Sequence, residues 1–424
     1  MSKRLLLAAL AVVLVLPTFA PANGLNLNGL GSRAVAMGGA FVGIANDFSA
    51  VFWNPAGAAG FRQPTFGFNA FDLIPSTTYS QRGTTLVVPE IDAKTQVSHY
   101  LGFLGAYYRP VGAKAVIGLG IGTTSGLGTM WDGADFAELS DGTVYEWSSK
   151  VGKITFSPLV AVKISEALSV GAAVNIDYGT FSLKMPAGTS SWPLVVELVD
   201  LGQYEENMNG WGFGATFGVL MKPVDTLSIG LTVRTPATVT FNGAASMSYM
   251  TFYDLPGSSD LKRKITWPLW IAGGVSFRPV ARLLLSADVH WTQWSKLDQI
   301  QTTFMDSVWH SLAAAEGRDL RILGWQDTMQ IRFGAEYILN ATTALRAGYY
   351  HDPTPAPVDR LDVLFPSHTL NAFSIGVGRT IGNLQLDFGL EYLAGNTRSS
   401  EWGFMTIAFG MDIVVPSVSV SYTF

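Results

Sequence analysis

Few side chains in this sequence could carry out nucleophilic or acid–base chemistry, and the most suggestive set is Ser286, Asp288 and His290. The three alternate along one expected strand, so they share a face, but neighbours on that face lie roughly 6–7 Å apart. This spacing is too long for the hydrogen bond between a nucleophile and its base. The sequence has no cysteine and no His-Glu-x-x-His pattern. We therefore predict that the protein is not an enzyme and holds neither a metal nor a cofactor.

Three arginines could instead hold an anion inside the protein. Arg234, Arg332 and Arg346 fall on the polar faces of expected strands. Each could bind a carboxylate by charge-assisted hydrogen bonds. The alternative is a structural role in charge pairs that line a wet interior, and such pairs are common.

One turn predicts how two of these strands align. If residues 340–342 form a three-residue hairpin loop, Glu336 lies opposite Arg346 on the polar face. The same register places Phe333 opposite Tyr349 on the apolar face. Polar residues then meet polar ones and apolar residues meet apolar ones.

The elements that would position these side chains are strands in which apolar and polar residues alternate. In the last strand one face carries Val418, Val420, Tyr422 and Phe424, and the other carries small hydroxyl residues. An outer-membrane β-barrel strand has this pattern, apolar toward lipid and polar toward the lumen. The terminal Phe424 also indicates recognition by the barrel assembly machinery. A soluble β-sandwich can alternate in the same way, so other signals must decide between the two.

The N-terminus favours the membrane alternative. Lys3 and Arg4 precede an apolar run over residues 5–16, and Ala20-Pro21-Ala22 offers the small residues of a cleavage site, so residues 1–22 are predicted to be a signal peptide. No later stretch of about 18 apolar residues follows. Any membrane span must therefore be built from strands, which places the protein in the outer membrane of a Gram-negative bacterium, in contact with its lipid.

The connections between strands alternate between long and short. Seven long and six short connections predict fourteen strands, the even count of a bacterial single-chain barrel. The expected long ones are 76–97, 123–150, 185–208, 244–263, 297–327, 352–367 and 397–402; the short ones are 110–113, 164–167, 223–226, 280–281, 340–341 and 382–383. We therefore predict an all-β transmembrane barrel over residues 63–424 with both strand ends on the periplasmic side.

Composition agrees with this fold. Charged residues make up only 14% of the chain. Without the signal peptide, the chain has 25 basic and 32 acidic residues, which gives a formal charge of −7. An acidic chain without basic clusters gives no reason to expect a nucleic-acid partner.

Residues 23–62 break the alternation and are rich in glycine and alanine. Short helical turns are expected here, with Asp47 as a possible N-cap and Asn54-Pro55 ending a turn. Four aromatic residues would form a large apolar patch if this segment were exposed: Phe41, Phe48, Phe52 and Trp53. We therefore predict that the segment is a hatch inside the barrel and that these rings line a pocket for a hydrophobic ligand.

The Asn54-Pro55-Ala56 motif in this segment resembles the FadL/TodX-type family of outer-membrane transporters for long-chain fatty acids and other hydrophobic compounds. Further stretches that resemble the family, in family order, are 168–171, 211–214, 288–294, 332–337 and 345–355. The resemblance covers essentially the whole mature chain. It implies a fourteen-stranded barrel closed by an N-terminal hatch, and passive uptake in which a ligand is captured by outer loops, held against the hatch and released sideways into the membrane.

Two loop stretches and one strand are candidates for the first and last of these stages. Residues 193–201 and 304–312 carry apolar side chains at helical spacing, as a capture groove would: Val195, Leu198, Val199, Phe304, Val308 and Leu312. Their alternative role is mutual packing. Gly118, Gly120 and Gly122 leave one strand face bare, which marks either a lateral gate or room for the hatch.

The cargo follows from the same features. An inner face rich in glycine and a plug with many aromatic rings favour a hydrophobic small molecule over the solutes of a gated hydrophilic porin. A long-chain fatty acid is the first expectation and a neutral aromatic hydrocarbon the alternative. The strand around residues 178–181 offers no basic residue before Lys184, whose position predicts that it faces lipid.

Overall fold

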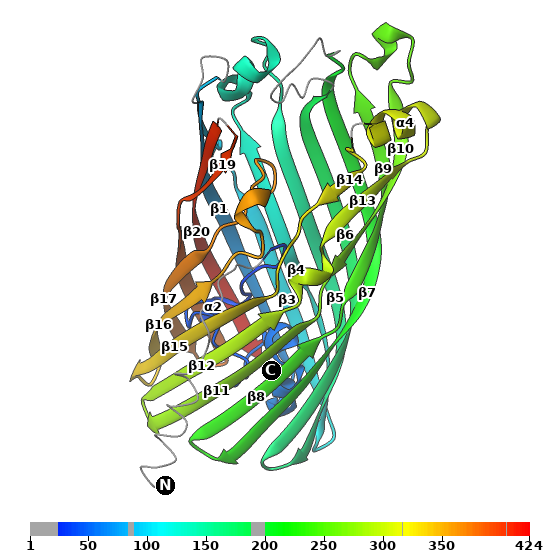
Figure 1. The fold of residues 1–424 in the computed structure, drawn as a ribbon. Helices are drawn as coiled ribbons and strands as arrows, with labels where there is room; N and C mark the ends of the chain where they lie inside the picture. Colours follow the sequence, from blue (N-terminus) through cyan, green and yellow to red (C-terminus); the bar gives the residue numbers. More distant parts are fainter. Residues whose placement is uncertain (1–23, 84–88, 188–199, 316, 404) are drawn as a thin grey trace.

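The computed structural model describes residues 24–83, 89–187, 200–315, 317–403 and 405–424 (Figure 1). The predicted signal peptide and the capture candidates Val195, Leu198 and Val199 lie outside the described residues. Among the described residues, no helix has the length and apolar character needed to cross a membrane.

The wall is a closed antiparallel β-barrel of fourteen strand positions, as predicted (Figure 1). Each strand of the wall pairs with the next wall strand along the chain, and the last pairs with the first. The wall strands are β1 (Thr65–Gly83), β3 (Tyr100–Val111), β4 (Ala115–Trp131), β5 (Trp147–Ser165), β6 (Leu168–Ala187), β7 (Gly202–Val224), β8 (Leu227–Arg234), β11 (Trp270–Val280), β12 (Leu283–Thr292), β15 (Thr328–Asn340), β16 (Thr343–Asp352), β17 (Leu370–Ile381), β18 (Leu384–Gly395) and β20 (Met405–Thr423).

Several wall positions continue toward the outer loops as separate strands. β9 (Ala237–Met247) prolongs β8 along β7, and β10 (Ser258–Trp267) pairs with β9 before the chain enters β11. Pro236 and Pro268 lie at these two interruptions, where a residue without an N–H cannot donate to the ladder. The remaining outer elements are β2 (Ile91–Lys94), η2 (Gly133–Ser140), η3 (Met250–Tyr253), η4 (Trp294–Lys296), β13 (Gln299–Phe304), α4 (Ser307–Ala315), β14 (Leu320–Ile322), η5 (Val358–Arg360) and β19 (Arg398–Trp402).

Strands extend further into the outer connections than the sequence pattern indicated. The expected loops 76–97 and 123–150 were wrong at their edges, because β1 continues to Gly83 and β4 to Trp131. The outer part of β4 stays paired with β5 after a register shift between Thr123 and Ser125, which reverses the face of every later residue. A search for apolar and polar residues that alternate with period two therefore ends the strand at such a bulge.

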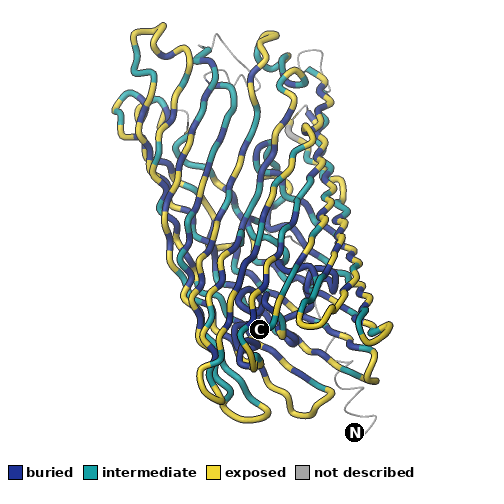
Figure 2. Tube along the Cα trace, turned by 180° about the vertical axis from the view of Figure 1, so that it is seen from behind, coloured by how far each residue is buried: buried dark blue, intermediate teal, exposed yellow. Residues whose placement is uncertain are grey.

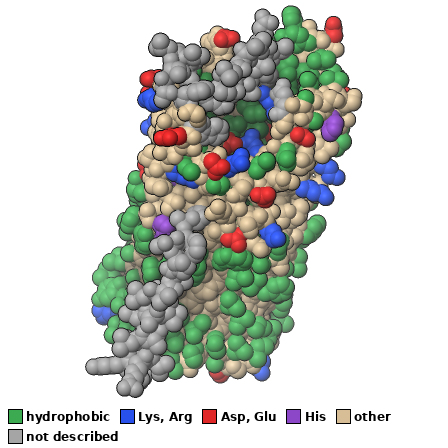
Figure 3. All heavy atoms as spheres, viewed as in Figure 1, with side chains coloured by type: hydrophobic (Ala, Val, Ile, Leu, Met, Phe, Trp, Pro, Cys, Tyr) green, Lys and Arg blue, Asp and Glu red, His purple; other side chains and the backbone are tan. Residues whose placement is uncertain are grey.

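Buried and exposed residues alternate along the strands (Figure 2). On one face of the molecule, hydrophobic side chains gather over the lower half and charged side chains over the upper half (Figure 3). The last strand follows the expected orientation, with Val418 and Tyr422 each 42% exposed and Ser419 buried. The predicted hairpin register is confirmed, since Glu336 pairs with Arg346 and Phe333 with Tyr349.

The N-terminal segment, residues 24–62, lies against the inner wall of the lower barrel (Figure 1). It contains α2 (Ser32–Val35), α3 (Ala50–Trp53) and η1 (Pro55–Gly60). Asp47 was wrong as an N-cap, because Ser49 holds that position in α3 and Asp47 accepts hydrogen bonds from the Ser49 N–H at 2.8 Å and hydroxyl at 2.5 Å. Asn54 ends α3 and its side chain accepts the Ala56 N–H at 3.1 Å.

Candidate functional site

The wall is interrupted between β3 and β4. The two strands pair from Val111–Ala115 up to Leu104–Gly122, and an isolated bridge then joins Thr95 to Trp131. Both contacts have the same register, yet within the described range 89–187 no pairing joins residues 97–103 to 123–129. We call this interruption the wall gap. Its rim is mixed, since Val97 and Leu101 are each 79% exposed and Met130 is 44% exposed, while His99 and Lys150 are exposed beside them.

A cavity of about 440 Å³ extends from the barrel interior to the wall gap. Leu127 pairs with the buried Val151 and Gly128 with the exposed Lys150, so these two pairs lie on opposite faces of the wall. All four residues line the cavity. The cavity therefore reaches both faces of the wall through the gap.

The interior walls of this cavity are mainly apolar with a few polar groups. Apolar lining comes from Leu27 and Val35 of the N-terminal segment and from β1, β17, β18 and β20. Two buried carboxyl groups, Asp352 and Glu391, also line it. Lys150, the single Lys or Arg among its described lining residues, lies on the outer face of the wall.

A small pocket of about 30 Å³ lies beside the large cavity, and Asn26 lines both. The Lys153 ammonium contacts Asp177 at 3.1 Å. The Arg234 guanidinium donates to the Phe52 carbonyl at 3.0 Å and lies 4.8 Å from the centre of the Trp270 ring. Among the described residues, no carboxylate lies within ion-pair distance of Arg234. Two cations thus share one buried carboxylate here, an arrangement suited to a further anion.

The other two predicted carboxylate ligands are engaged with the protein itself. Arg332 is 1% exposed and donates to Gln330 at 2.6 and 3.1 Å and to the Gly38 carbonyl at 3.1 Å. Arg346 contacts Glu336 at 2.8 Å and Asp387 at 2.7 Å. Neither lines the large cavity, and Arg346 lines a polar cavity of about 320 Å³ at the short-turn end of the barrel.

The Asn54-Pro55-Ala56 motif fastens the N-terminal segment to the wall. The Asn54 amide donates to the Val42 carbonyl and to the Val219 carbonyl of β7, each at 3.0 Å. A Cβ at Gly171 of β6 would lie 2.4 Å from the Pro55 carbonyl carbon, so this approach requires glycine. The motif joins two parts of the N-terminal segment to one side of the barrel.

The four aromatic rings of the expected ligand pocket lie in the core between the N-terminal segment and the wall. Phe41, Phe48, Phe52 and Trp53 are all at most 7% exposed. Phe52 lines the small pocket, and none of the four lines the large cavity.

The glycines expected at a gate lie next to the wall gap, on its paired side. Gly118, Gly120 and Gly122 pair with β3 below the gap. A Cβ at Gly120 would lie 2.7 Å from Val51 of the N-terminal segment, and one at Gly118 would lie 2.6 Å from the Tyr108 ring. Of the three, Gly120 is the one whose added Cβ would meet the N-terminal segment, as the alternative role of room for the hatch requires.

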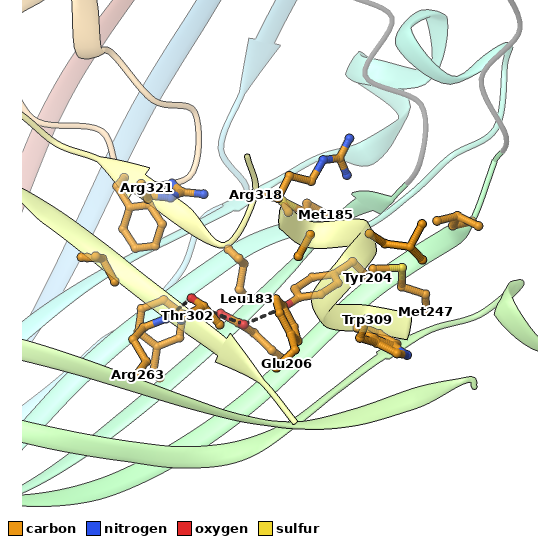
Figure 4. A pocket seen from close by; sticks show the side chains of 17 residues that line it. Leu183, Met185, Tyr204, Glu206, Met247, Arg263, Thr302, Trp309, Arg318 and Arg321 are labelled. Atoms are coloured by element: carbon orange, nitrogen blue, oxygen red, sulfur yellow. Dashed lines mark hydrogen bonds and ion pairs between the residues drawn. The ribbon is translucent and has the colours of Figure 1, made fainter. Parts of the chain in front are cut away.

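An outer pocket of about 90 Å³ lies among α4 and strands β6, β7, β9, β10 and β13 (Figure 4). Phe304 and Leu312 line it, while Val308 packs on the neighbouring apolar cluster. On its floor, Arg263 makes two hydrogen bonds to Glu206, at 2.6 and 2.9 Å. The remaining lining is largely apolar, so the pocket suits a hydrophobic ligand.

The geometry around His290 does not form a catalytic triad. The His290 Nε2 atom lies 3.4 Å from Asp288, whose other role is to accept the Val42 N–H at 2.8 Å. The Ser286 hydroxyl donates to the Gly334 carbonyl instead. In the described part of the chain, no cluster of three His, Asp or Glu residues could hold a metal ion.

Sequence reasoning missed three features of this region: Lys153, the wall gap above Gly122, and the cavity that passes through it. Lys153 lies on the inner face in the unbroken alternation of β5, so its direction follows from that strand alone, but its ion pair with Asp177 does not. The glycines Gly126 and Gly128 were the available signal for the gap, since both line it.

Comparison with known proteins agrees with this architecture. The sequence model of the family described as "Outer membrane protein transport protein (OMPP1/FadL/TodX)" matches residues 13–403. The long-chain fatty acid transport protein of Salmonella typhi is 23% identical over 421 residues, covering 92% of both chains. Other relatives match over a shorter part, down to 65% of their own length.

Two solved structures share the fold. The crystal structure of a Pseudomonas aeruginosa FadL homologue superposes with a TM-score of 0.77 at 16% identity, covering 95% of this chain and all of that one. The P. putida toluene transporter TodX superposes with a TM-score of 0.74 at 17% identity, covering 94% and 99%. At these identities the structural likeness establishes the fold alone.

Proposed function

Since this chain belongs to the OMPP1/FadL/TodX family of outer-membrane transport proteins, we propose that it takes up hydrophobic small molecules passively, through its outer pocket, large cavity and wall gap. The protein is an outer-membrane β-barrel and not an enzyme. The proposed cargo is a fatty-acid-like amphiphile.

The outer pocket is the proposed point of capture. It combines aromatic and aliphatic side chains with Arg318 and Arg321 (Figure 4). Arg321 contacts Asp362 at 2.5 Å and lies over the Phe365 ring at 4.8 Å. An apolar tail would bury against α4, and its polar head would stay near these guanidinium groups.

The large cavity is the proposed holding site. Its volume of about 440 Å³ falls within the range of roughly 300–1,000 Å³ that is common for small-molecule pockets. The N-terminal segment forms its floor through Asn28, Gly29 and Val35, so in this proposal the segment acts as a hatch that blocks a straight path to the periplasm.

The wall gap is the proposed exit. Val97 and Leu101 expose apolar side chains on its rim, so a hydrophobic molecule that leaves the cavity there would pass over apolar surface. Backbone ladders join neighbouring strands along most of the described wall, and a ligand cannot cross a paired ladder.

One observation supports an amphiphile with a carboxylate over other cargo. The large cavity and the small pocket with Lys153 and Arg234 are neighbours and share the lining residue Asn26. A long apolar tail in the cavity would bring its head group to the two cations, where a carboxylate balances the extra positive charge. The name of the S. typhi relative, a long-chain fatty acid transport protein, supports the same cargo.

The test is uptake by cells that lack their own transporter. Arg234→Gln should lower uptake of a labelled long-chain fatty acid about tenfold or more, because a hydrogen bond to a charged group contributes roughly 1.5–3 kcal/mol. Uptake of a labelled neutral aromatic hydrocarbon should stay unchanged. Arg282→Gln, which removes an exposed cation in a short turn, is the matched control. Equal losses for both cargoes would mean that Arg234 is structural.

A second candidate cargo is a neutral aromatic hydrocarbon. The specific observation in its favour is that the large cavity is lined by the carboxyl groups of Asp352 and Glu391 and by no inward-facing Lys or Arg among the described residues. The toluene transporter TodX shares the fold. Hydrocarbon uptake without fatty-acid uptake would select this candidate, and uptake of neither would overturn the proposal.

A further inference from the structure

We propose that the Tyr100 ring is the door of the wall gap, and that residue 128 is glycine because the closed door rests on it. This inference rests on the proposed exit through the gap and assigns the residue that controls it. It concerns two side-chain positions on opposite edges of the gap.

The ring of Tyr100 reaches across the gap to β4. A Cβ built at Gly128 would lie 2.6 Å from Cε1 of Tyr100 and 2.8 Å from both Cζ and the hydroxyl oxygen. The ring therefore lies directly on the Gly128 backbone, closer than any other residue type would allow. Both residues also line the large cavity, so the ring stands between the cavity and the outer face of the wall.

The two edges of the gap differ in how firmly they are held. The β4 edge is bound by the N-terminal segment: Asn26 bridges to Ser125, and the Ser125 hydroxyl both donates to the Leu25 carbonyl and accepts the Trp267 indole N–H. Ser125 is fully buried. This edge is a fixed frame for the door.

The β3 edge is free along the gap. Tyr100 pairs with Leu73 of β1 on one side, and in the range 89–187 no strand pairs with residues 97–103 on the side of β4. Tyr100 itself is half-buried and its neighbour Leu101 is 79% exposed. Rotation of a partly exposed ring about its side-chain torsions is fast compared with backbone rearrangement, so the door can move without unpairing β3 from β1.

The chemistry of tyrosine suits this position. Its ring is apolar and matches both the cavity and the lipid-facing rim, while its hydroxyl group can stay at a polar edge. A molecule that leaves the cavity must displace the ring, so the size of the opening with the ring turned aside sets the bulk of the cargo that exits rapidly.

Gly126 provides a matched control two residues away. A Cβ there would meet only Leu27, at 3.8 Å, which is an ordinary van der Waals contact. Gly126→Ala should therefore leave the door closed, whereas Gly128→Ala should push the ring out of the gap. The two variants make the same chemical change on the same strand.

The experiment measures the uptake rate of a bulky labelled hydrocarbon in cells that produce comparable surface levels of each variant. Tyr100→Ala and Gly128→Ala should each raise the rate several-fold, and Tyr100→Phe and Gly126→Ala should each raise it much less than these two. The double variant Tyr100→Ala/Gly128→Ala should equal Tyr100→Ala, because no ring remains to be displaced. Unchanged uptake rates in both Tyr100→Ala and Gly128→Ala would contradict the proposal that the Tyr100 ring closes the wall gap.

A blocking variant separates failure of the door from failure of the route. Gly126→Trp fills the gap with an indole and should stop uptake. If it stops uptake while Tyr100→Ala and Gly128→Ala match the unchanged protein, the door alone is wrong. If Gly126→Trp transports normally, the proposed exit through the gap is wrong, and the proposed role of Tyr100 is wrong as well. A rate lowered by Gly128→Ala and not restored by Tyr100→Ala would also contradict the door.

Discussion

The N-terminal segment meets two sides of the barrel in opposite ways. On the side of β15 to β18, Arg33 binds Glu336 at 2.8 and 3.0 Å, and Glu336 also binds Arg346. On the side of β3 and β4, the described residues of the segment form hydrogen bonds to Tyr108 and Ser125 but no ion pair, and a stretch of ladder is missing. We call these the fastened side and the open side. The difference indicates that charge pairs hold the segment where the wall is complete, and that neutral hydrogen bonds and packing hold it beside the gap.

Blocking the open side should have the largest effect. Gly126→Trp places a large ring in the cavity where it passes through the wall, so we expect nearly complete loss of uptake for fatty acid and hydrocarbon alike. Uptake assays with Gly126→Ala as the control check this. If Gly126→Trp transports at the normal rate, the open side is not the exit, and the two sides do not differ in function as proposed.

Weakening the fastened side should have the next largest effect. Glu336→Gln leaves the buried Arg33 and Arg346 without their shared carboxylate, and breaking a buried pair in this way costs roughly 3–5 kcal/mol. We expect the N-terminal segment to detach more readily and small sugars to leak through the purified barrel in a bilayer. Conductance recordings would measure the leak.

The control for this change is an exposed ion pair. Lys163→Gln removes a partner of Glu166 in a short turn, where such a pair contributes about 0–1 kcal/mol. Equal conductance in Glu336→Gln and Lys163→Gln would show that the charge network does not hold the segment.

A smaller effect should separate packing glycines from gap glycines on β4. Gly120→Ala places a Cβ 2.7 Å from Val51, so we expect about 1–3 kcal/mol of destabilisation from overpacking. Val51→Ala in the same protein should restore most of it. Thermal unfolding in detergent measures both, and a Gly120→Ala protein of normal stability would contradict the packing role.

The smallest expected effect is a pH dependence in the outer connection between β16 and β17. Burial lowers the pKa of His368 to about 4, below its ordinary value of 6.5, although its hydrogen bond to the Asn396 carbonyl acts in the opposite direction. The neutral form is therefore favoured in the folded loop, and its stabilising contribution is present above pH 6.5 and lost as the pH falls toward 4. Limited proteolysis should cut this loop faster over that range, and His368→Gln should remove the pH dependence.

The sequence predicts the barrel well because each strand has lipid on one side and water on the other. Apolar and polar residues must therefore alternate along every strand. The register of the 340–342 hairpin follows from the same rule. The wall gap does not, because it depends on a bulge at Thr123 to Ser125 and on the N-terminal segment that binds the exposed edge. Neither is visible in the period of a single strand.

The anion candidates show a second limit. Arg234, Arg332 and Arg346 all face inward as expected, yet one borders a pocket that can accept a head group and the others are bound by Gln330, Glu336 and Asp387. The alternation of residues along a strand fixes the direction of each side chain. It carries no information about the partners of that side chain on distant strands. Lys153 escaped notice for the same reason.

The missing ladder between β3 and β4 also makes this seam mechanically weaker than the junction between the two ends of the chain. The strands at the two ends of the chain, β1 and β20, pair along almost their whole length, from Thr65–Thr423 to Gly83–Met405. β3 and β4 pair only over residues 104–111 and 115–122. Under lateral tension the cylinder would open at this internal seam, while the junction where the chain closes on itself stays intact.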